Sequence, residues 1–291
     1  MKKLWRASKK QVLNSNLKQY ENFITSKHKI KFKNNYDRIF DWSIKNKGNF
    51  WDSVWDFCKV KGQKGKVKIK NSKTFHKNLF LSDYKLNFAE NILIKNDHTK
   101  AATFISENGF REERSWFQLN ENVSKLITYF KKINIKKGDR VSAYLPNLIQ
   151  TVECFIATSA IGAIWSSCSP DFGLNGVVER FAQIKPKILI IGDRYYYNGK
   201  EINIIERLPK ILNKIKSIKH VLVINYPGKK YLEFKKTFGI KFKSFKEIQS
   251  YSASSISYEK FNFNTELAIL YSSGTTGKPK CICHRSGGVL L

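Results

Sequence analysis

Beyond residue 98, short apolar runs alternate with longer segments in which apolar residues recur every three or four positions. The short runs lie at residues 139–145, 163–169, 186–193 and 220–225. The helical segments between them lie at residues 119–130, 147–162, 176–185 and 202–215. Short strands that alternate with helices form βα units, in which the strands pair in parallel. The pattern predicts an α/β fold whose parallel sheet is covered by helices on both faces.

The first ninety-odd residues differ, because their apolar positions have helical spacing without intervening strands. Residues 15–30 place Leu17, Tyr20, Phe23 and Ile24 on one helical face, after a capping Ser15 or Asn16. Residues 36–60 repeat this pattern with Trp51, Val54, Trp55 and Cys58, and the pattern breaks near Lys47 and Gly48. We interpret this aromatic stripe as core or docking surface. The lysine-rich residues 58–78 predict a loop or ragged strands. We therefore expect a helical N-terminal extension over residues 1–98 and a second domain over residues 99–291.

Local signals fix several boundaries within the second domain. Asn108-Gly109 lies between two β-prone runs and predicts a hairpin. Ser115 lies three residues before Gln118, which is the spacing of a capping box. Pro146 is expected at the first position of the next helix. Residues 228–262 are rich in lysine and serine and predict no element.

The charge balance raises the possibility of a nucleic-acid-binding protein. The 291 residues include 53 Lys+Arg against 23 Asp+Glu, for a formal net charge of +30, and only nine of the basic residues are arginine. Proteins that read bases or grip phosphates in bidentate fashion rely on arginine, and these lysines are spread along the whole chain. We expect no nucleic-acid partner, and we keep a basic nucleic-acid-binding protein as the alternative from outside the enzyme class.

The remaining composition is that of a globular protein in a reducing compartment. Hydrophobic residues make up 42% of the chain, which is enough to form a core. No apolar run approaches the roughly 18 residues that span a bilayer, and residues 11–20 are too polar to be the core of a signal peptide. Five scattered cysteines are expected to be reduced thiols. We expect a cytoplasmic protein with no membrane partner.

The strongest chemical signal follows an apolar strand expected at residues 267–271. The sequence SSGTTGKPK over residues 272–280 combines two glycines, four hydroxyl groups and two lysines. Glycines let backbone amides approach an anion, and hydroxyl and ammonium groups add donors, so the segment predicts phosphate binding. It is not a Walker A loop, because Ser272 and Pro279 stand where that pattern needs Gly and a Ser or Thr.

This segment resembles the phosphate loop of the adenylate-forming superfamily, which includes acyl-CoA synthetases, adenylation domains and luciferases. Cys281 stands where that family usually has Gly. The resemblance extends over nearly the whole chain, through LWRAS, LNFAENIL, GDRVSAYLPN, SAIGAIWSSCSPDFG, VVERFAQIKPKILI and GDRYYYNGKEI. In these segments the chain looks most like the branch that joins acetoacetate to CoA, and less like the acetate-specific branch.

The resemblance implies a two-step ligation that uses ATP with Mg²⁺, and CoA as co-substrate. A carboxylate first attacks the α-phosphorus of ATP to give an acyl-adenylate and diphosphate, and the CoA thiolate then displaces AMP. The implied ATP-phosphate ligands are Ser272, Ser273, Gly274, Thr275, Thr276, Gly277, Lys278 and Lys280. Of these, Thr276 and Lys278 are the candidate catalytic side chains, because charge builds on the leaving diphosphate. The implied CoA-binding residues are Arg194, Tyr197, Asn198, Gly199 and Lys200.

Two other groups of polar residues have simpler interpretations. Cys281, Cys283 and His284 are metal-ligand types, but zinc needs four ligands and no second pair lies nearby, so we expect no protein-bound metal. We interpret Asp171 and Glu179 as capping or surface residues.

The chain ends in GGVLL, which predicts a helix that continues past Leu291. The superfamily's adenine-site motif, acyl pocket and C-terminal domain would lie beyond that point, so we expect an N-terminal fragment that is inactive alone. We also expect apolar surface to be uncovered on strands such as residues 188–191 and 267–271. Another short-chain acyl-CoA synthetase, such as one specific for acetate, is the alternative within the superfamily.

Overall fold

The computed structural model describes residues 4–74, 77–234, 239–272 and 277–291, which divide into two compact units. The first unit comprises the described residues up to Lys85, together with Asn262–Asn264 and Leu291. The second comprises Leu86–Phe261 and Thr265–Leu290. Each unit has its own apolar core, and each is described here by itself.

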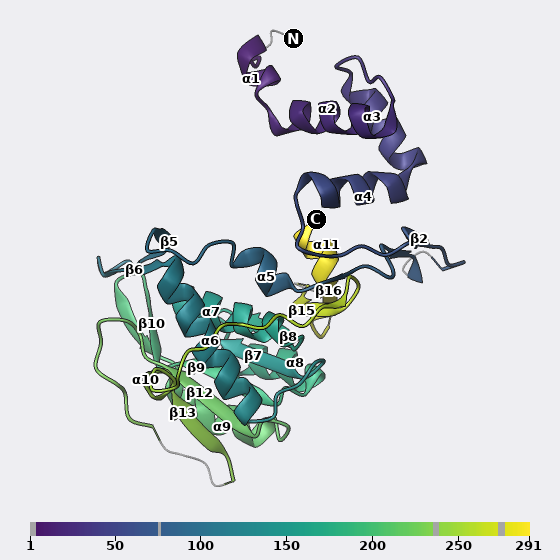
Figure 1. Ribbon diagram of the computed structural model, residues 1–291. Helices are drawn as coiled ribbons and strands as arrows, with labels where there is room; N and C mark the ends of the chain where they lie inside the picture. Colours follow the sequence, from purple (N-terminus) through teal and green to yellow (C-terminus); the bar gives the residue numbers. More distant parts are fainter. Residues whose placement is uncertain (1–3, 75–76, 235–238, 273–276) are drawn as a thin grey trace. The chain divides into compact units, whose positions relative to one another are not determined.

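Helices dominate the first unit: α1 (Lys9–Leu13), α2 (Asn16–His28), α3 (Tyr36–Lys45) and α4 (Lys47–Phe57) (Figure 1). The Ser15 side chain accepts a hydrogen bond from the Lys18 amide and caps α2, as predicted. Asn46 separates α3 from α4, beside the predicted break. Residues 58–85 form short strands: β1 (Gly62–Gln63), β2 (Ile69–Lys70), β3 (Leu79–Phe80) and β4 (Lys85–Leu86), the last of which reaches into the second unit.

The aromatic stripe of this unit is core, as predicted. Tyr20, Ile24, Phe32, Ile39 and Trp42 form one buried cluster. Trp55 is 3% exposed and packs edge-on against Tyr84. Cys58, at the end of the same stripe, caps α4 and is exposed.

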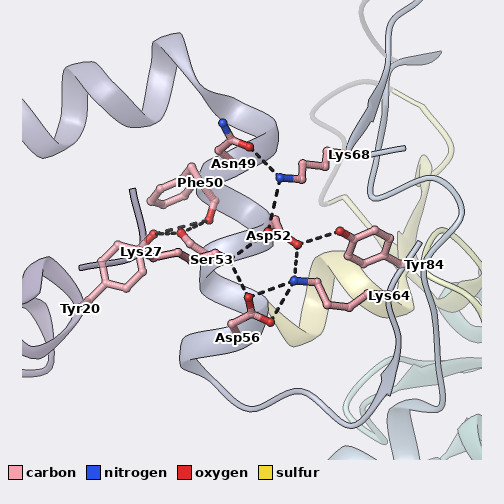
Figure 2. A network of polar contacts seen from close by, with 10 residues as sticks. All are labelled: Tyr20, Lys27, Asn49, Phe50, Asp52, Ser53, Asp56, Lys64, Lys68 and Tyr84. Atoms are coloured by element: carbon pink, nitrogen blue, oxygen red, sulfur yellow. Dashed lines mark hydrogen bonds and ion pairs between the residues drawn. The ribbon is translucent and has the colours of Figure 1, made fainter. Parts of the chain in front are cut away.

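A charged network also joins the elements of the first unit (Figure 2). The Asp52 carboxylate on α4 receives ion pairs from Lys27, Lys64 and Lys68, at 3.0, 2.5 and 3.5 Å. It also accepts a hydrogen bond from the Tyr84 hydroxyl at 2.7 Å. One buried carboxylate therefore ties α2 and the strand segment to α4.

A seven-stranded sheet forms the centre of the second unit, in the order β13-β12-β9-β7-β8-β15-β16 (Figure 1). In that order the strands are Lys241–Ser244, His220–Ile224, Ile188–Gly192, Arg140–Tyr144, Ile164–Cys168, Glu266–Tyr271 and Cys281–Arg285. The first six pair in parallel, and β16 pairs antiparallel with β15. The predicted α/β class and parallel sheet are confirmed.

Helices cover both faces of this sheet. On one face, α8 (Leu174–Ile184) and α9 (Leu208–Lys214) bury Val177, Phe181 and Ile211 against β7, β9 and β12. On the other, α6 (Trp116–Lys132) and α7 (Ile149–Ala160) pack against each other. Residues 188–191 are fully buried by this arrangement, so the expected exposure of that strand was wrong. On residues 267–271, Leu267 is buried and Leu270 is 45% exposed, so the expectation holds only for part of that strand.

The remaining elements are short. They are α5 (Phe88–Ile92), β5 (Lys100–Ile105), β6 (Arg111–Ser115), β10 (Arg194–Tyr197), β11 (Lys200–Asn203), η2 (Ile205–Arg207), α10 (Phe245–Ile248), β14 (Phe261–Asn262) and α11 (Ser286–Leu290). β5 and β6 form the predicted hairpin around Gly109, which has φ +79°. The Ser115–Gln118 capping box is also present.

Three boundary predictions were wrong. Pro146 precedes the N-cap of α7, Leu148, because the Pro146 carbonyl accepts bonds from the Leu148 amide and the Thr151 hydroxyl. Residues 202–203 belong to β11, and the helix assigned there begins at Leu208. Residues 241–244 form the parallel edge strand β13, in a region where we predicted no element.

Candidate functional site

The predicted phosphate-binding segment lies at the carboxyl end of β15, among the carboxyl ends of the parallel strands. In open α/β sheets ligands bind at this edge. Tyr271 pairs with Cys281 across the β15–β16 hairpin, and the Ser272 amide donates to the Lys280 carbonyl at 3.1 Å. Residues 272–280 are therefore the connection of this hairpin.

Only the two ends of the connection belong to the described residues. Four predicted ATP ligands, Ser273, Gly274, Thr275 and Thr276, lie outside them. At the described end, Gly277 has φ +100°, a conformation that favours glycine. Lys278 and Lys280 are exposed on either side of the buried Pro279. Both ammonium groups are thus available to an anion at this edge of the sheet.

Helix α8 contacts both ends of the connection. The Gln183 amide donates to the Pro279 carbonyl at 3.0 Å. The Tyr271 hydroxyl donates to the Arg180 carbonyl at 3.2 Å and lies 3.1 Å from the Ser166 hydroxyl on β8. The contact between Ser166 and Tyr271 joins residues 105 positions apart, so distant parts of the chain hold the phosphate-binding segment.

The side chains beneath the segment stay uncharged at neutral pH. Burial is the main cause that raises the pKa of Tyr271 well above its usual 10, against the opposing hydrogen bond with Ser166. Burial likewise raises the pKa of Cys168 to about 12, although Arg180 opposes this shift. The raised pKa values disfavour a phenolate or a thiolate nucleophile at these two positions.

These supporting contacts could not be predicted from the sequence. Nothing in a single sequence pairs Gln183 with Pro279, because the two residues belong to different βα units. Tyr271 and Ser166 are not marked by their neighbours, because other residues of the same two strands are also polar. Pairings of this kind follow from the order of the strands in the sheet.

The predicted CoA residues lie together on the β10–β11 hairpin. Asn198 and Gly199 form its turn with φ +50° and +72°, and the Gly199 amide donates to Glu107 at 2.9 Å. Tyr197 is 62% exposed, and Lys200 is exposed. The Arg194 guanidinium is buried instead, where it forms ion pairs with Asp193 and Glu201 at 3.2 and 2.7 Å and donates to the Lys230 carbonyl.

A cavity of about 510 Å³ lies beside this hairpin. Its lining includes Glu107, Asn147, Leu148, Tyr196 and Tyr226. The Lys229 ammonium lies 5.3 Å from the centre of the Tyr196 ring, close to the cavity. Two aromatic rings with a nearby cation are suited to a ligand that has both a ring and a negative charge.

The remaining polar candidates form no second site. Cys281, Cys283 and His284 lie on β16, and within the described part of the chain no cluster of three His, Cys, Asp or Glu could hold a metal ion. Asp171 accepts a hydrogen bond from the Ser169 hydroxyl, and Glu179 is exposed on α8. Among the described helices, none is long and apolar enough to cross a membrane.

The candidate site lies at the carboxyl edge of a parallel sheet covered by helices, which defines the chain as an α/β protein with the usual ligand-binding edge of that class. The model of the AMP-binding enzyme family matches residues 94–290. The chain belongs to the AMP-binding enzyme family.

Several relatives are acetoacetyl-CoA synthetases. The chain is 38% identical to acetoacetyl-coenzyme A synthetase from Rhizobium meliloti (strain 1021), over 88% of this chain and 39% of that protein. It is 36% identical to acetoacetyl-CoA synthetase from Xenopus tropicalis, again over 88% of this chain and 39% of that protein. The solved structure of acetoacetyl-CoA synthetase from Streptomyces lividans superposes with a TM-score of 0.89 at 27% identity, over 99% of this chain and 44% of that chain. The chain thus spans about two fifths of the length of these relatives.

Proposed function

We propose that the chain is part of an acid–thiol ligase that joins acetoacetate to CoA at the expense of ATP. An acetoacetate carboxylate oxygen attacks the α-phosphorus, and the bond to diphosphate breaks. The CoA thiolate then attacks the acyl carbon, and AMP leaves. The observation that carries this proposal is the position of Lys278 and Lys280 at the carboxyl edge of the sheet, in a chain whose similar relatives are acetoacetyl-CoA synthetases.

The role of residues 272–280 is electrostatic. Diphosphate gains negative charge as it leaves, so cations and donors held around the β- and γ-phosphates lower the barrier. Lys278 and Lys280 supply two charges, and Ser272, Ser273, Thr275 and Thr276 supply hydroxyl donors, with Gly274 and Gly277 allowing close approach of the backbone. Mg²⁺ enters as part of the MgATP substrate and is held by the phosphates.

The proposed domain organisation follows from the same family. Residues 1–98 form an N-terminal extension, and residues 99–291 form the first part of the AMP-binding domain. The family match from residue 94 supports this division. A cytoplasmic location fits the five free cysteines, because a reducing compartment keeps thiols unpaired.

AMP release tests the ligase proposal. The assay uses a chimera in which the chain is continued by the part of the Rhizobium meliloti relative that has no counterpart here. Because the acyl pocket then comes from the relative, the assay tests whether this chain completes a working ligase and not which acid it selects. Acetoacetate should release AMP in the presence of ATP and CoA, and absence of that release would contradict the proposal.

We propose that the cavity beside the β10–β11 hairpin receives the nucleotide part of CoA. The exposed Lys200 provides a charge for its phosphates, and Tyr197 provides an exposed ring. The Lys200→Ala variant should bind CoA about 3–10-fold more weakly, as measured by calorimetry on the 291-residue chain, because one phosphate contact is lost. Lys131→Ala, at an exposed lysine on α6, serves as the control. Equal affinity of both variants for CoA would place the binding site elsewhere.

A further inference from the structure

We propose that Gln183 is a positioning residue that fixes Lys278 and Lys280, and that Cys281 orients its amide. This inference rests on the proposed function, because it concerns how the phosphate-binding segment is held. Gln183 lies on α8, touches no predicted substrate group, and acts through the backbone of the segment.

The hydrogen bonds of the Gln183 side chain are all made with other groups of the protein. Its Nε2 donates to the Pro279 carbonyl at 3.0 Å and to the Glu179 carbonyl at 2.8 Å. Its Oε1 accepts from the Cys281 thiol, with Sγ 3.7 Å away. Rotating the amide by 180° would turn its oxygen toward two carbonyls and its NH₂ toward the thiol, so one orientation is selected.

Cys281 lies directly after Lys280. Its thiol adds a third contact to the two donated by Gln183 Nε2. The side chain at the end of the phosphate-binding segment therefore helps to hold Gln183 in one orientation.

The opposite end of the segment is held from the same helix. The Tyr271 hydroxyl donates a hydrogen bond to the carbonyl of Arg180, which lies one helical turn before Gln183. The Ser272 amide then closes the hairpin onto the Lys280 carbonyl. Since Gln183 holds the Pro279 carbonyl, the backbone between Lys278 and Lys280 is attached to α8. Fixing a binding segment in advance reduces the entropy lost when an anion binds.

Two measurements on the 291-residue chain test this role. Gln183→Met keeps the length of the side chain and removes the donor. Asn175→Met makes a similar change at an exposed site on the same helix. We expect Gln183→Met to weaken diphosphate binding about 3–10-fold, as measured by calorimetry, since the loss of a hydrogen bond of this kind corresponds to about one kcal/mol. We expect Cys281→Gly to have a smaller effect in the same direction, and Asn175→Met to have none.

The exchange rate of the Ser272 amide hydrogen provides the second readout. It should rise in Gln183→Met and stay unchanged in Asn175→Met, at equal thermal midpoints, because only the ends of the segment are loosened. Unchanged exchange at Ser272 in Gln183→Met would overturn the positioning role. If the wild-type chain binds no diphosphate, the proposed function fails, while the exchange measurement still decides the role of Gln183.

Discussion

Asp52→Asn is expected to lower the free energy of unfolding of the N-terminal unit by about 2–3 kcal/mol. The Asp52 side chain is 5% exposed and is the common partner of Lys27, Lys64 and Lys68 (Figure 2). Without its charge, Lys68 loses its ion pair, and Lys27 and Lys64 share the single carboxylate of Asp56. Breaking a buried ion pair costs about 3–5 kcal/mol of stability. The loss expected here is smaller, because the lysines are 27–39% exposed and can turn toward water.

Chemical denaturation of the wild-type and variant chains would measure this difference. Asp56→Asn is the matched control, because Asp56 shares Lys27 and Lys64 but is 33% exposed. Its expected cost is below about 1 kcal/mol. Equal losses in the two variants would show that burial of Asp52 has no special role in the first unit.

Acid unfolding provides an independent check on Asp52. Burial alone would raise its pKa, but hydrogen bonds from Lys64, Tyr84 and Lys27 outweigh burial and hold the pKa well below the usual 3.8. A carboxyl whose pKa is depressed by folding stabilises the folded state above its unfolded pKa, and this stability is lost as the pH falls toward the folded value. We expect the stability of the wild type to decline below about pH 4 and that of Asp52→Asn to decline less steeply.

Features of the fold that depend on neighbouring residues could be predicted from the sequence. The Ser115–Gln118 capping box and the Asn108-Gly109 turn use groups within three residues of each other, so their residue types suffice. The buried strands could also be found, because the apolar runs of a parallel sheet are short and continuous.

Features that depend on distant partners could not be predicted. β13 contains alternating lysines, and it is a strand because its backbone pairs with β12. Pro146 does not begin α7, because its carbonyl is used by the Leu148 amide and the Thr151 hydroxyl. In the candidate site, the motif identified Lys278 and Lys280, but the contacts of Gln183 and Tyr271 with the segment arise only when α8 and β15 pack in the same unit.

Lys278→Ala is expected to lower adenylation by about 10² or more. The Lys278 ammonium projects from the residue before the anchored Pro279, and we propose that it contacts the phosphates on which charge develops as diphosphate leaves. Removing one preorganised donor from a developing anion costs about 10²–10³ in rate in well-studied enzymes. Thr276→Val, which removes a hydroxyl donor from the same segment, should act in the same direction.

Acetoacetate-dependent exchange of labelled diphosphate into ATP measures this step without the CoA half-reaction. The assay uses the chimera described above, and Lys131→Ala on α6 is the control for loss of a lysine that is exposed elsewhere in the same unit.

Lys278→Arg keeps the charge and should retain more exchange than Lys278→Ala, because the charge supplies most of the stabilisation while the planar guanidinium fits the ammonium position imperfectly. The proposed role of residues 272–280 requires exchange to fall in Lys278→Ala and to persist in Lys131→Ala. If Lys278→Ala exchanged diphosphate at the rate of the unmodified chimera, the ammonium would have no part in stabilising the leaving group, and ATP phosphates would have to bind elsewhere along the carboxyl edge of the sheet.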